Sequence, residues 1–482
     1  MKFFAVTLLI SIVGWAFAGE SSWAYWYFAV AGAACWALEK RSGRLLSFPM
    51  VFIMVATLAA VFGFVYYERI SEDAVVSFHI DYDRDTWVMG FNTILLCIFW
   101  FWVAAMLATR RRKTEDEDAG QPPLAYISGK AAMWLIVIGI LSIIVYVVGY
   151  GYTGLLRRAH YLMFTGPRVF VSLGALFGPA ASLALSIVIV HRRPPIALRV
   201  IAAMVLALLT VAMFGTGSRG LAAIPLAFLW CWWLIRGPEA KIWSKIVVTA
   251  LCLYAAALAF SSVLILRVGL GGESGIVTYF NYYDQHPDEL GTIDVGALAG
   301  NILFGVPLTG DIVTTGNPFP LSYLGIALNP MPGGPAGWNA ILDQFSWAPA
   351  TPYNVYGELY LYGAIPLALT MGLFGLAMGT MDSWVARRRA NVRNIVFVII
   401  LVLILVFTSS TFQYPVRNSS RFLWYGGVLL LAMELLTGPF VSFLHRYRLM
   451  PRGNVRRRTP RRGRRPSKAV KKARALYGNP KF

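Results

Sequence analysis

The sequence predicts an all-α protein, a polytopic transmembrane helical bundle of about twelve spans. Of its 482 residues, 57% are hydrophobic and only 14% are charged, a composition typical of membrane bundles rather than soluble domains. The apolar residues gather in runs long enough to cross a hydrocarbon core of about 30 Å. Loops rich in lysine and arginine alternate with loops that lack lysine, as repeated membrane crossing requires. We therefore expect one bundle, residues 1–444, followed by a basic tail, residues 445–482.

The apolar runs place the spans. The first run also resembles a signal peptide, because Lys2 precedes an apolar centre and Ala16-Phe17-Ala18 resembles a cleavage site. We favour an uncleaved span there, since a second apolar run follows after a few residues. The expected spans are 3–18, 22–38, 46–66, 88–108, 131–150, 169–190, 196–214, 221–235, 246–265, 359–380, 394–410 and 422–440.

The distribution of basic residues orients the bundle. Short loops that carry many lysines and arginines stay in the cytoplasm, and this rule predicts that both termini are cytoplasmic. The intervening loops contain no lysine and are expected outside. Between spans nine and ten, residues 267–358 form an outer loop that is too long to be structureless in a compact protein, so we expect it to be ordered and functional.

The tail explains the net charge of +20. Residues 445–482 carry fifteen lysines and arginines and no acidic residue, and they are rich in proline and glycine. Such a segment is expected to be disordered and cytoplasmic, with anionic lipid as its partner. The alternative is a solvated topology anchor without a ligand. Because the excess charge is confined to the tail, a nucleic-acid partner is not expected.

Arginines on the outer side suggest an anionic ligand, because basic residues there run against the topological rule. A guanidinium presents a rigid fork that suits phosphate or carboxylate groups, whereas lysine offers a mobile point charge. Arg69 and Arg84 share their loop with several acids and are expected to form solvated pairs. For the others, a phosphate role competes with that of a snorkelling anchor. The outer arginines are Arg69, Arg84, Arg157, Arg158, Arg168, Arg219, Arg267, Arg417 and Arg421.

The clearest local motif joins the seventh and eighth spans at the outer surface, in residues 215–220. Ser218 can cap the following helix, whose free N–H groups attract anions, and Arg219 adds a positive charge. A plain tight turn between two spans explains the same residues.

Thr216-Gly217-Ser218-Arg219-Gly220 at the outer start of a span, with a large outer loop two spans later, resembles the bacterial O-antigen ligase and oligosaccharide repeat-unit polymerase superfamily. Gly357-Glu358-Leu359-Tyr360, followed by Gly363, resembles the segment that closes the loop in these polymerases. The similarity of organisation covers residues 130–440. It implies a glycosyltransferase of the plasma membrane that consumes a glycan on undecaprenyl diphosphate, is metal-independent and inverting, and needs no cofactor. Other polysaccharide-export components are then possible partners.

That reaction must stabilise a departing diphosphate and remove a proton from an acceptor hydroxyl. For the diphosphate the best pair is Arg219 and Arg267, and the further candidates are Arg157, Arg158 and Ser218. For the proton, Glu358 is the first candidate, because partial desolvation beside the membrane raises the pKa of a carboxyl group. His286 is the second, within an aromatic and polar segment that can hold a sugar or form a surface turn.

Two other classes of protein remain open. A secondary transporter or lipid-linked glycan flippase has the same layout of twelve spans with both termini inside. Sparse charges within the spans and one asymmetric outer loop favour the enzyme. A non-catalytic scaffold tethered by its tail leaves the outer arginines unexplained.

Overall fold

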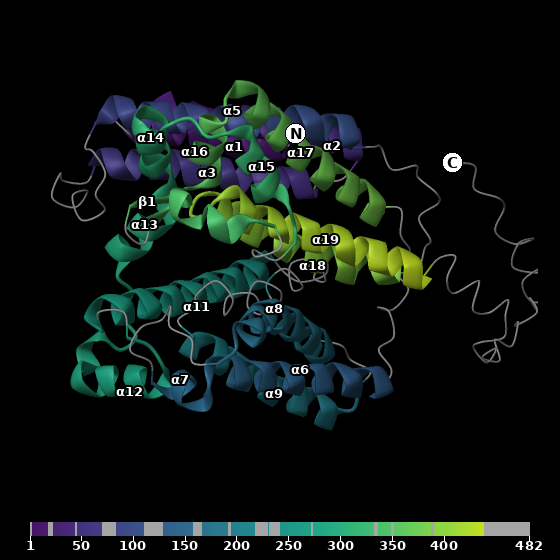
Figure 1. Ribbon diagram of the computed structural model, residues 1–482. Helices are drawn as coiled ribbons and strands as arrows, with labels where there is room; N and C mark the ends of the chain where they lie inside the picture. The colour runs from purple at the N-terminus through teal and green to yellow at the C-terminus, as the bar shows by residue number, and fades with distance from the viewer. Residues whose placement is uncertain are drawn as a thin grey trace, which may run out of the picture. The chain divides into compact units, whose positions relative to one another are not determined.

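The computed structural model describes residues 2–17, 23–43, 46–69, 83–109, 129–157, 166–190, 194–216, 230, 242–270, 273–331, 336–348, 351–386 and 390–437. The chain divides into two compact units, Met1–Gly427 and Val428–Phe482. The described residues are helical apart from turns and one antiparallel hairpin, β1 (Ser346–Ala348) and β2 (Thr351–Pro352) (Figure 1). The predicted all-α class is therefore confirmed. The predicted basic tail, 445–482, lies outside the described residues.

Long helices lie on the predicted apolar runs, and within the described residues six of them are long and apolar enough to cross a membrane. These six are α3, α5, α6, α9, α11 and α17, and they identify a multi-pass membrane protein. The predicted run 221–235 lies outside the described residues except for Trp230. The long helices are α1 (Lys2–Phe17), α2 (Trp26–Ser42), α3 (Phe48–Arg69), α5 (Arg84–Ala108), α6 (Gly129–Tyr150), α8 (Arg168–Val190), α9 (Ile196–Gly215), α11 (Ile242–Gly269), α17 (Ala364–Ala386), α18 (Ala390–Thr411) and α19 (Val416–Thr437).

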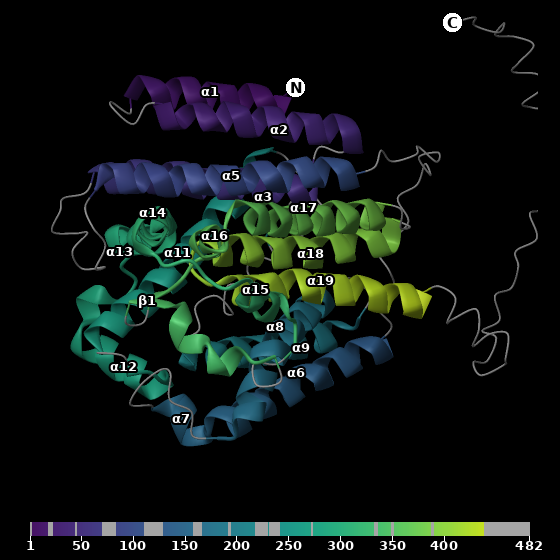
Figure 2. The ribbon, with the colours of Figure 1, turned by 45° about the horizontal axis from the view of Figure 1, so that its top comes forward.

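Helix α5 is the centre of one group of helices and packs against α3 and α17 (Figure 2). Its first turn is capped by Asp83, whose carboxylate accepts hydrogen bonds from the backbone N–H groups of Asp85 and Thr86. Along the shared interface, the rings of Phe52 in α3 and Phe101 in α5 lie 4.1 Å apart. Gly375 of α17 lies so close to the carbonyl oxygen of Phe101 that a Cβ would clash. Small residues and rings thus allow close helix packing along this interface.

Polar contacts fix the helix ends on the side that is predicted to be cytoplasmic. Asp382, near the end of α17, accepts a hydrogen bond of 3.2 Å from the N–H of Phe48, the first residue of α3. Ser383 donates to the carbonyl oxygen of Ala108, and the Nε of Arg41 donates to that of Thr109 at 2.8 Å. The ends of α2, α3, α5 and α17 are held together by these bonds, which satisfy groups that helix termini leave free.

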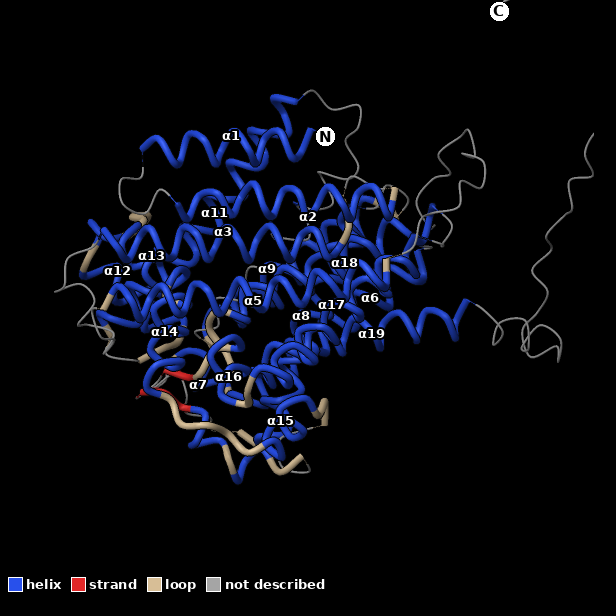
Figure 3. The backbone as a smooth tube through the Cα atoms, turned by 90° about the horizontal axis from the view of Figure 1, so that it is seen from above, coloured by secondary structure: helices blue, strands red, loops and turns tan. Residues whose placement is uncertain are grey.

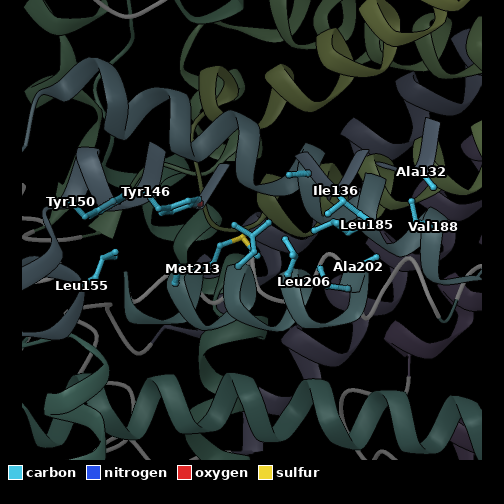
Figure 4. Close-up of a cluster of buried hydrophobic side chains, with 14 residues drawn as sticks. Ala132, Ile136, Tyr146, Tyr150, Leu155, Leu185, Val188, Ala202, Leu206 and Met213 are labelled. Carbon is cyan, nitrogen blue, oxygen red and sulfur yellow. The ribbon is translucent and has the colours of Figure 1, made fainter. Parts of the chain in front are cut away.

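A second group consists of α6, α8 and α9, which share a buried apolar core (Figure 4). Tyr146 of α6 is completely buried and lies against Gly178 of α8, where a larger residue would overlap its hydroxyl. Leu185 of α8 and Met213 of α9 complete this core. Helix α7 (Tyr152–Leu156) continues from α6 after a turn at Gly151.

The long segment between α11 and α17 folds into short helices and the hairpin (Figure 3). Helix α14 is embedded against α3, α5 and α16, and its residues from Gly305 to Val313 are all buried. Gly90 of α5 and Gly310 of α14 allow this approach, because a Cβ on either would clash with the backbone of the other helix. The short helices are α12 (Ile276–Gln285), α13 (Val295–Leu303), α14 (Gly305–Thr315), α15 (Leu321–Leu328) and α16 (Val355–Leu361).

Candidate active site

Helix α16 places Glu358, the predicted proton acceptor, inside the protein. Asn354 caps this helix by accepting a hydrogen bond of 2.9 Å from the N–H of Gly357. The side-chain NH₂ of Asn354 donates to the carbonyl oxygen of Gly305 and to the hydroxyl of Thr309, both in α14. One asparagine thus starts α16 and binds it to the embedded α14, so that Glu358, one turn later, has a fixed position.

Both carboxylate oxygens of Glu358 are hydrogen-bonded. The backbone N–H of Val416 donates to Oε2 at 2.6 Å, and the hydroxyl of Tyr362 donates to Oε1 at 3.2 Å. Glu358 is fully buried, and the loss of hydration raises its pKa to about 8, although both hydrogen bonds act in the opposite direction. A carboxyl group in this state is mostly protonated at neutral pH, and its ionised form is a stronger base than an ordinary carboxylate.

Arg417, the residue after Val416, is also fully buried. Its Nη1 donates to the carbonyl oxygens of Ile326 and Asn329 at 2.7 and 3.0 Å, and its Nη2 donates to that of Met331 at 2.5 Å. The guanidinium also lies 5.3 Å from the ring centre of Trp338. Arg417 therefore fastens the chain that follows α15 to the start of α19.

An aromatic cluster connects the surroundings of Glu358 with those of Arg417. The ring of Tyr362 lies 5.7 Å from Phe319, and that ring lies 5.0 Å from Phe345. Phe345 in turn lies 4.6 Å from Trp338, which faces Arg417. A continuous set of contacts therefore links Glu358 through the aromatic rings to Arg417, and Val416, next to Arg417, bonds back to Glu358. This region is a single packed unit.

The segments that carry the other predicted arginines meet elsewhere in the chain. Gly215, the last residue of α9, lies against Ile276 of α12 and the carbonyl oxygen of Leu155 in α7. Gly275, with φ of +124°, lies against the backbone of Arg157. Only glycine readily adopts this conformation, so the approach of the two segments depends on it. The side chain of Arg157 is exposed.

One small buried cluster extends this junction to α11. Phe214 of α9 lies 5.5 Å from the ring of Tyr279 in α12, and both pack with Leu266 of α11. Leu266 directly precedes Arg267, whose backbone belongs to α11 and whose side chain is not among those described. Arg158, Ser218 and Arg219 lie outside the described residues.

His286 follows α12 and is exposed. Its ring stacks on Tyr282 at 4.5 Å, and its Nδ1 lies 3.0 Å from the carbonyl oxygen of the same residue. The hydroxyl of Tyr282 donates to Glu289 at 2.8 Å. These contacts make a local surface arrangement in which His286 and Glu358 share no partner among the described contacts.

Some residues of the site were not predicted from the sequence. Arg417 was grouped with the outer arginines but not chosen as a ligand, although its place two residues after Pro415 and four residues before Arg421 was visible. Tyr362 stands four residues after Glu358, which is the spacing of contacts on one helix face. Trp338 carried no signal, because only the folded chain brings it to Arg417.

Comparisons with family models, curated proteins and solved structures find no match to this chain.

Proposed function

We propose that this protein is a membrane glycosyltransferase that polymerises or ligates oligosaccharide from an undecaprenyl-diphosphate carrier at the outer face of the bacterial plasma membrane. The observation that carries the proposal is the state of Glu358, which is fully buried, held through both oxygens and given a pKa of about 8 by its burial. A group of this kind is suited to accept a proton from a sugar hydroxyl in a site shielded from water.

In the proposed reaction, an acceptor hydroxyl loses its proton to ionised Glu358 as its oxygen attacks the anomeric carbon of the donor glycan. A new carbon–oxygen bond forms on one face of the sugar while the bond to the lipid diphosphate breaks on the other, which inverts the configuration. The diphosphate leaves with the electron pair of the broken bond. Glu358 holds the proton until solvent removes it. The hydroxyl of Tyr362 donates to the ionised carboxylate, and it can donate to or accept from the protonated carboxyl group.

The departing diphosphate needs fixed positive charge, which is a large catalytic contribution in a site that excludes water. We assign this role to Arg219 and Arg267, with Arg157, Arg158 and Ser218 as further ligands. The contacts among α7, α9, α11 and α12 support this assignment. Gly215, three residues before Ser218, lies against Leu155, which is two residues before Arg157. Leu266, which precedes Arg267, packs with Phe214 at the end of α9. His286 has a smaller part, as an exposed group that contacts the acceptor sugar beside Tyr282.

The proposal also includes the topology. Twelve spans with both termini in the cytoplasm place the segment 267–358 outside, where a lipid-linked glycan is available. The tail, 445–482, then faces the anionic inner leaflet and binds its lipids. Removal of residues 452–482 is expected to leave transfer intact, whereas a scaffold tethered by its tail would lose its function.

The test uses purified protein in detergent with a lipid-diphosphate oligosaccharide and a chelator. Formation of new glycosidic bonds by the wild type supports the enzyme. A flippase would form none in detergent but would move the labelled glycan across vesicles. The wild type is compared with Arg219→Ala, Arg267→Ala and Glu358→Ala, and we expect a large loss of product in each. Equal product from all three variants would show that the proposed site is wrong.

A further inference from the structure

Two arginines stand one helical turn apart at the start of α19. Arg417 is fully buried, and Arg421 is half-buried and therefore reaches the surface. Arg417 binds three carbonyl groups through Nη1 and Nη2, and its Nε is buried without a hydrogen-bond partner among the described residues. A buried donor that forms no hydrogen bond is unfavourable and rare in native proteins, and a bound ion is one way in which it is satisfied.

No carboxylate balances this pair of charges within the part of the chain that the structure describes. Neither Arg417 nor Arg421 forms an ion pair there. The carboxyl group that contacts this turn is Glu358, through Val416, and its raised pKa of about 8 keeps it mostly uncharged at neutral pH. The N-terminus of a helix is itself positive, so it repels cations in its first turns.

Three sources of positive potential thus coincide at one point without a counter-charge. A buried charge is tolerated when it is paired, and carbonyl groups alone provide dipoles rather than an opposite charge. Arg84 gives the contrasting case, because this exposed arginine is paired with Glu68 at 2.8 Å. Of the two arginines, Arg421 is the one that reaches the surface, so a ligand can contact its guanidinium there.

We propose that Arg417 and Arg421 form an oxyanion-binding site at the start of α19, which receives a carboxylate or phosphate group of the substrate. Arg421 contacts the anion from the surface side, and Arg417 supplies fixed charge from behind it. The identity of the substrate rests on the proposed function, in which the anion is either an acidic sugar of the glycan or the lipid diphosphate itself. The binding of an oxyanion does not rest on it.

The experiment measures binding to the full-length protein in detergent by calorimetry, at pH 7 and constant ionic strength. Three probes are compared, namely glucuronate, inorganic pyrophosphate and glucose. We expect one of the two anions to bind and glucose not to bind. Arg421→Gln should weaken binding of that anion by about tenfold or more, since a charge-assisted contact is lost. If glucuronate binding depends on Arg421, the natural ligand is an acidic sugar. If pyrophosphate binding depends on Arg421, the natural ligand is the diphosphate of the lipid carrier.

Arg84→Gln is the matched control, because it removes one outer arginine that already has a partner. It should leave the affinity for both anions unchanged. Equal affinities for wild type and Arg421→Gln would overturn the oxyanion site, as would an equal loss in Arg84→Gln. Both measurements are independent of turnover, so a chain that binds the anion but forms no glycosidic bond would refute the proposed function and leave this site standing.

Discussion

The backbone N–H of Val416 donates a hydrogen bond of 2.6 Å to the carboxylate of Glu358 and so joins two residues 58 positions apart. Val416 is the first residue of α19, and an N–H at that position has no partner within its own helix. Glu358 therefore caps one helix while it belongs to another. Substitutions at Glu358 must separate this structural role from the proposed chemical one.

Glu358→Gln separates the two roles. The amide oxygen can still accept from Val416 and the NH₂ group can donate to the Tyr362 oxygen, so the fold should be retained. The amide cannot take up the proton of the sugar hydroxyl that attacks the donor. We therefore expect the rate of glycan transfer to fall by about 10²-fold to 10⁴-fold. Product formation and elution volume on a sizing column are measured together. Wild-type rates in a folded Glu358→Gln protein would remove Glu358 from the chemistry.

The pH dependence of transfer follows from the raised pKa of Glu358. The base must be ionised, so the rate should rise with pH until it levels above about 8. The hydrogen bond from Tyr362 lowers that pKa, and Tyr362→Phe should therefore move the rise to higher pH. Tyr356→Phe is the control, because the hydroxyl of Tyr356 bonds to Thr411 instead. A profile that does not move in Tyr362→Phe contradicts this account.

The free energy of unfolding should fall as the pH rises, whereas the transfer rate rises. In the folded protein Glu358 keeps its proton up to a pKa of about 8, while in the unfolded chain it loses it near 4.5. The contribution of Glu358 to stability is thus fully present below pH 4.5 and is lost as the pH rises through 8. The loss corresponds to roughly 5 kcal/mol. Melting temperatures of wild type and Glu358→Gln in detergent should differ increasingly between these limits, and parallel curves would exclude an ionising Glu358.

Gly310→Ala tests the embedded position of α14. A Cβ at Gly310 would overlap the carbonyl oxygen of Thr86 in α5, so the two helices must move apart. We expect a loss of about 1–3 kcal/mol, seen as a lower melting temperature. Gly325→Ala in α15 has nothing within 4 Å of the new methyl group and should melt like the wild type. Equal melting of the two variants would mean that α14 does not pack as described.

The sequence predicted where the long described helices lie, because long apolar runs in a membrane have few alternatives to the α-helix. The count of twelve spans stays a prediction, since six of the described helices are long and apolar enough to cross a membrane. The sequence did not predict that α14 is embedded, since burial of this helix depends on glycines in two helices that are far apart in sequence, Gly90 and Gly310.

The prediction of the site was uneven for a similar reason. Partial desolvation of Glu358 was expected from its position beside a span, and the structure buries the side chain completely. Its partners were not, because Val416 and Trp338 come to the site only when distant parts of the chain fold together. The roles of Arg219, Arg158 and Ser218 remain predictions, since these residues lie outside the described part of the chain.

The embedding of α14 limits how this chain can be engineered. Segments between membrane helices are often exchanged between enzymes as cassettes to transfer specificity. Here the region from Gly305 to Val313 supplies part of the interior against α3, α5 and α16. In a chimaera that receives only this segment from another enzyme, the foreign segment would pack poorly against the native α3, α5 and α16. A transfer of specificity would therefore require the matching faces of those helices to be exchanged as well.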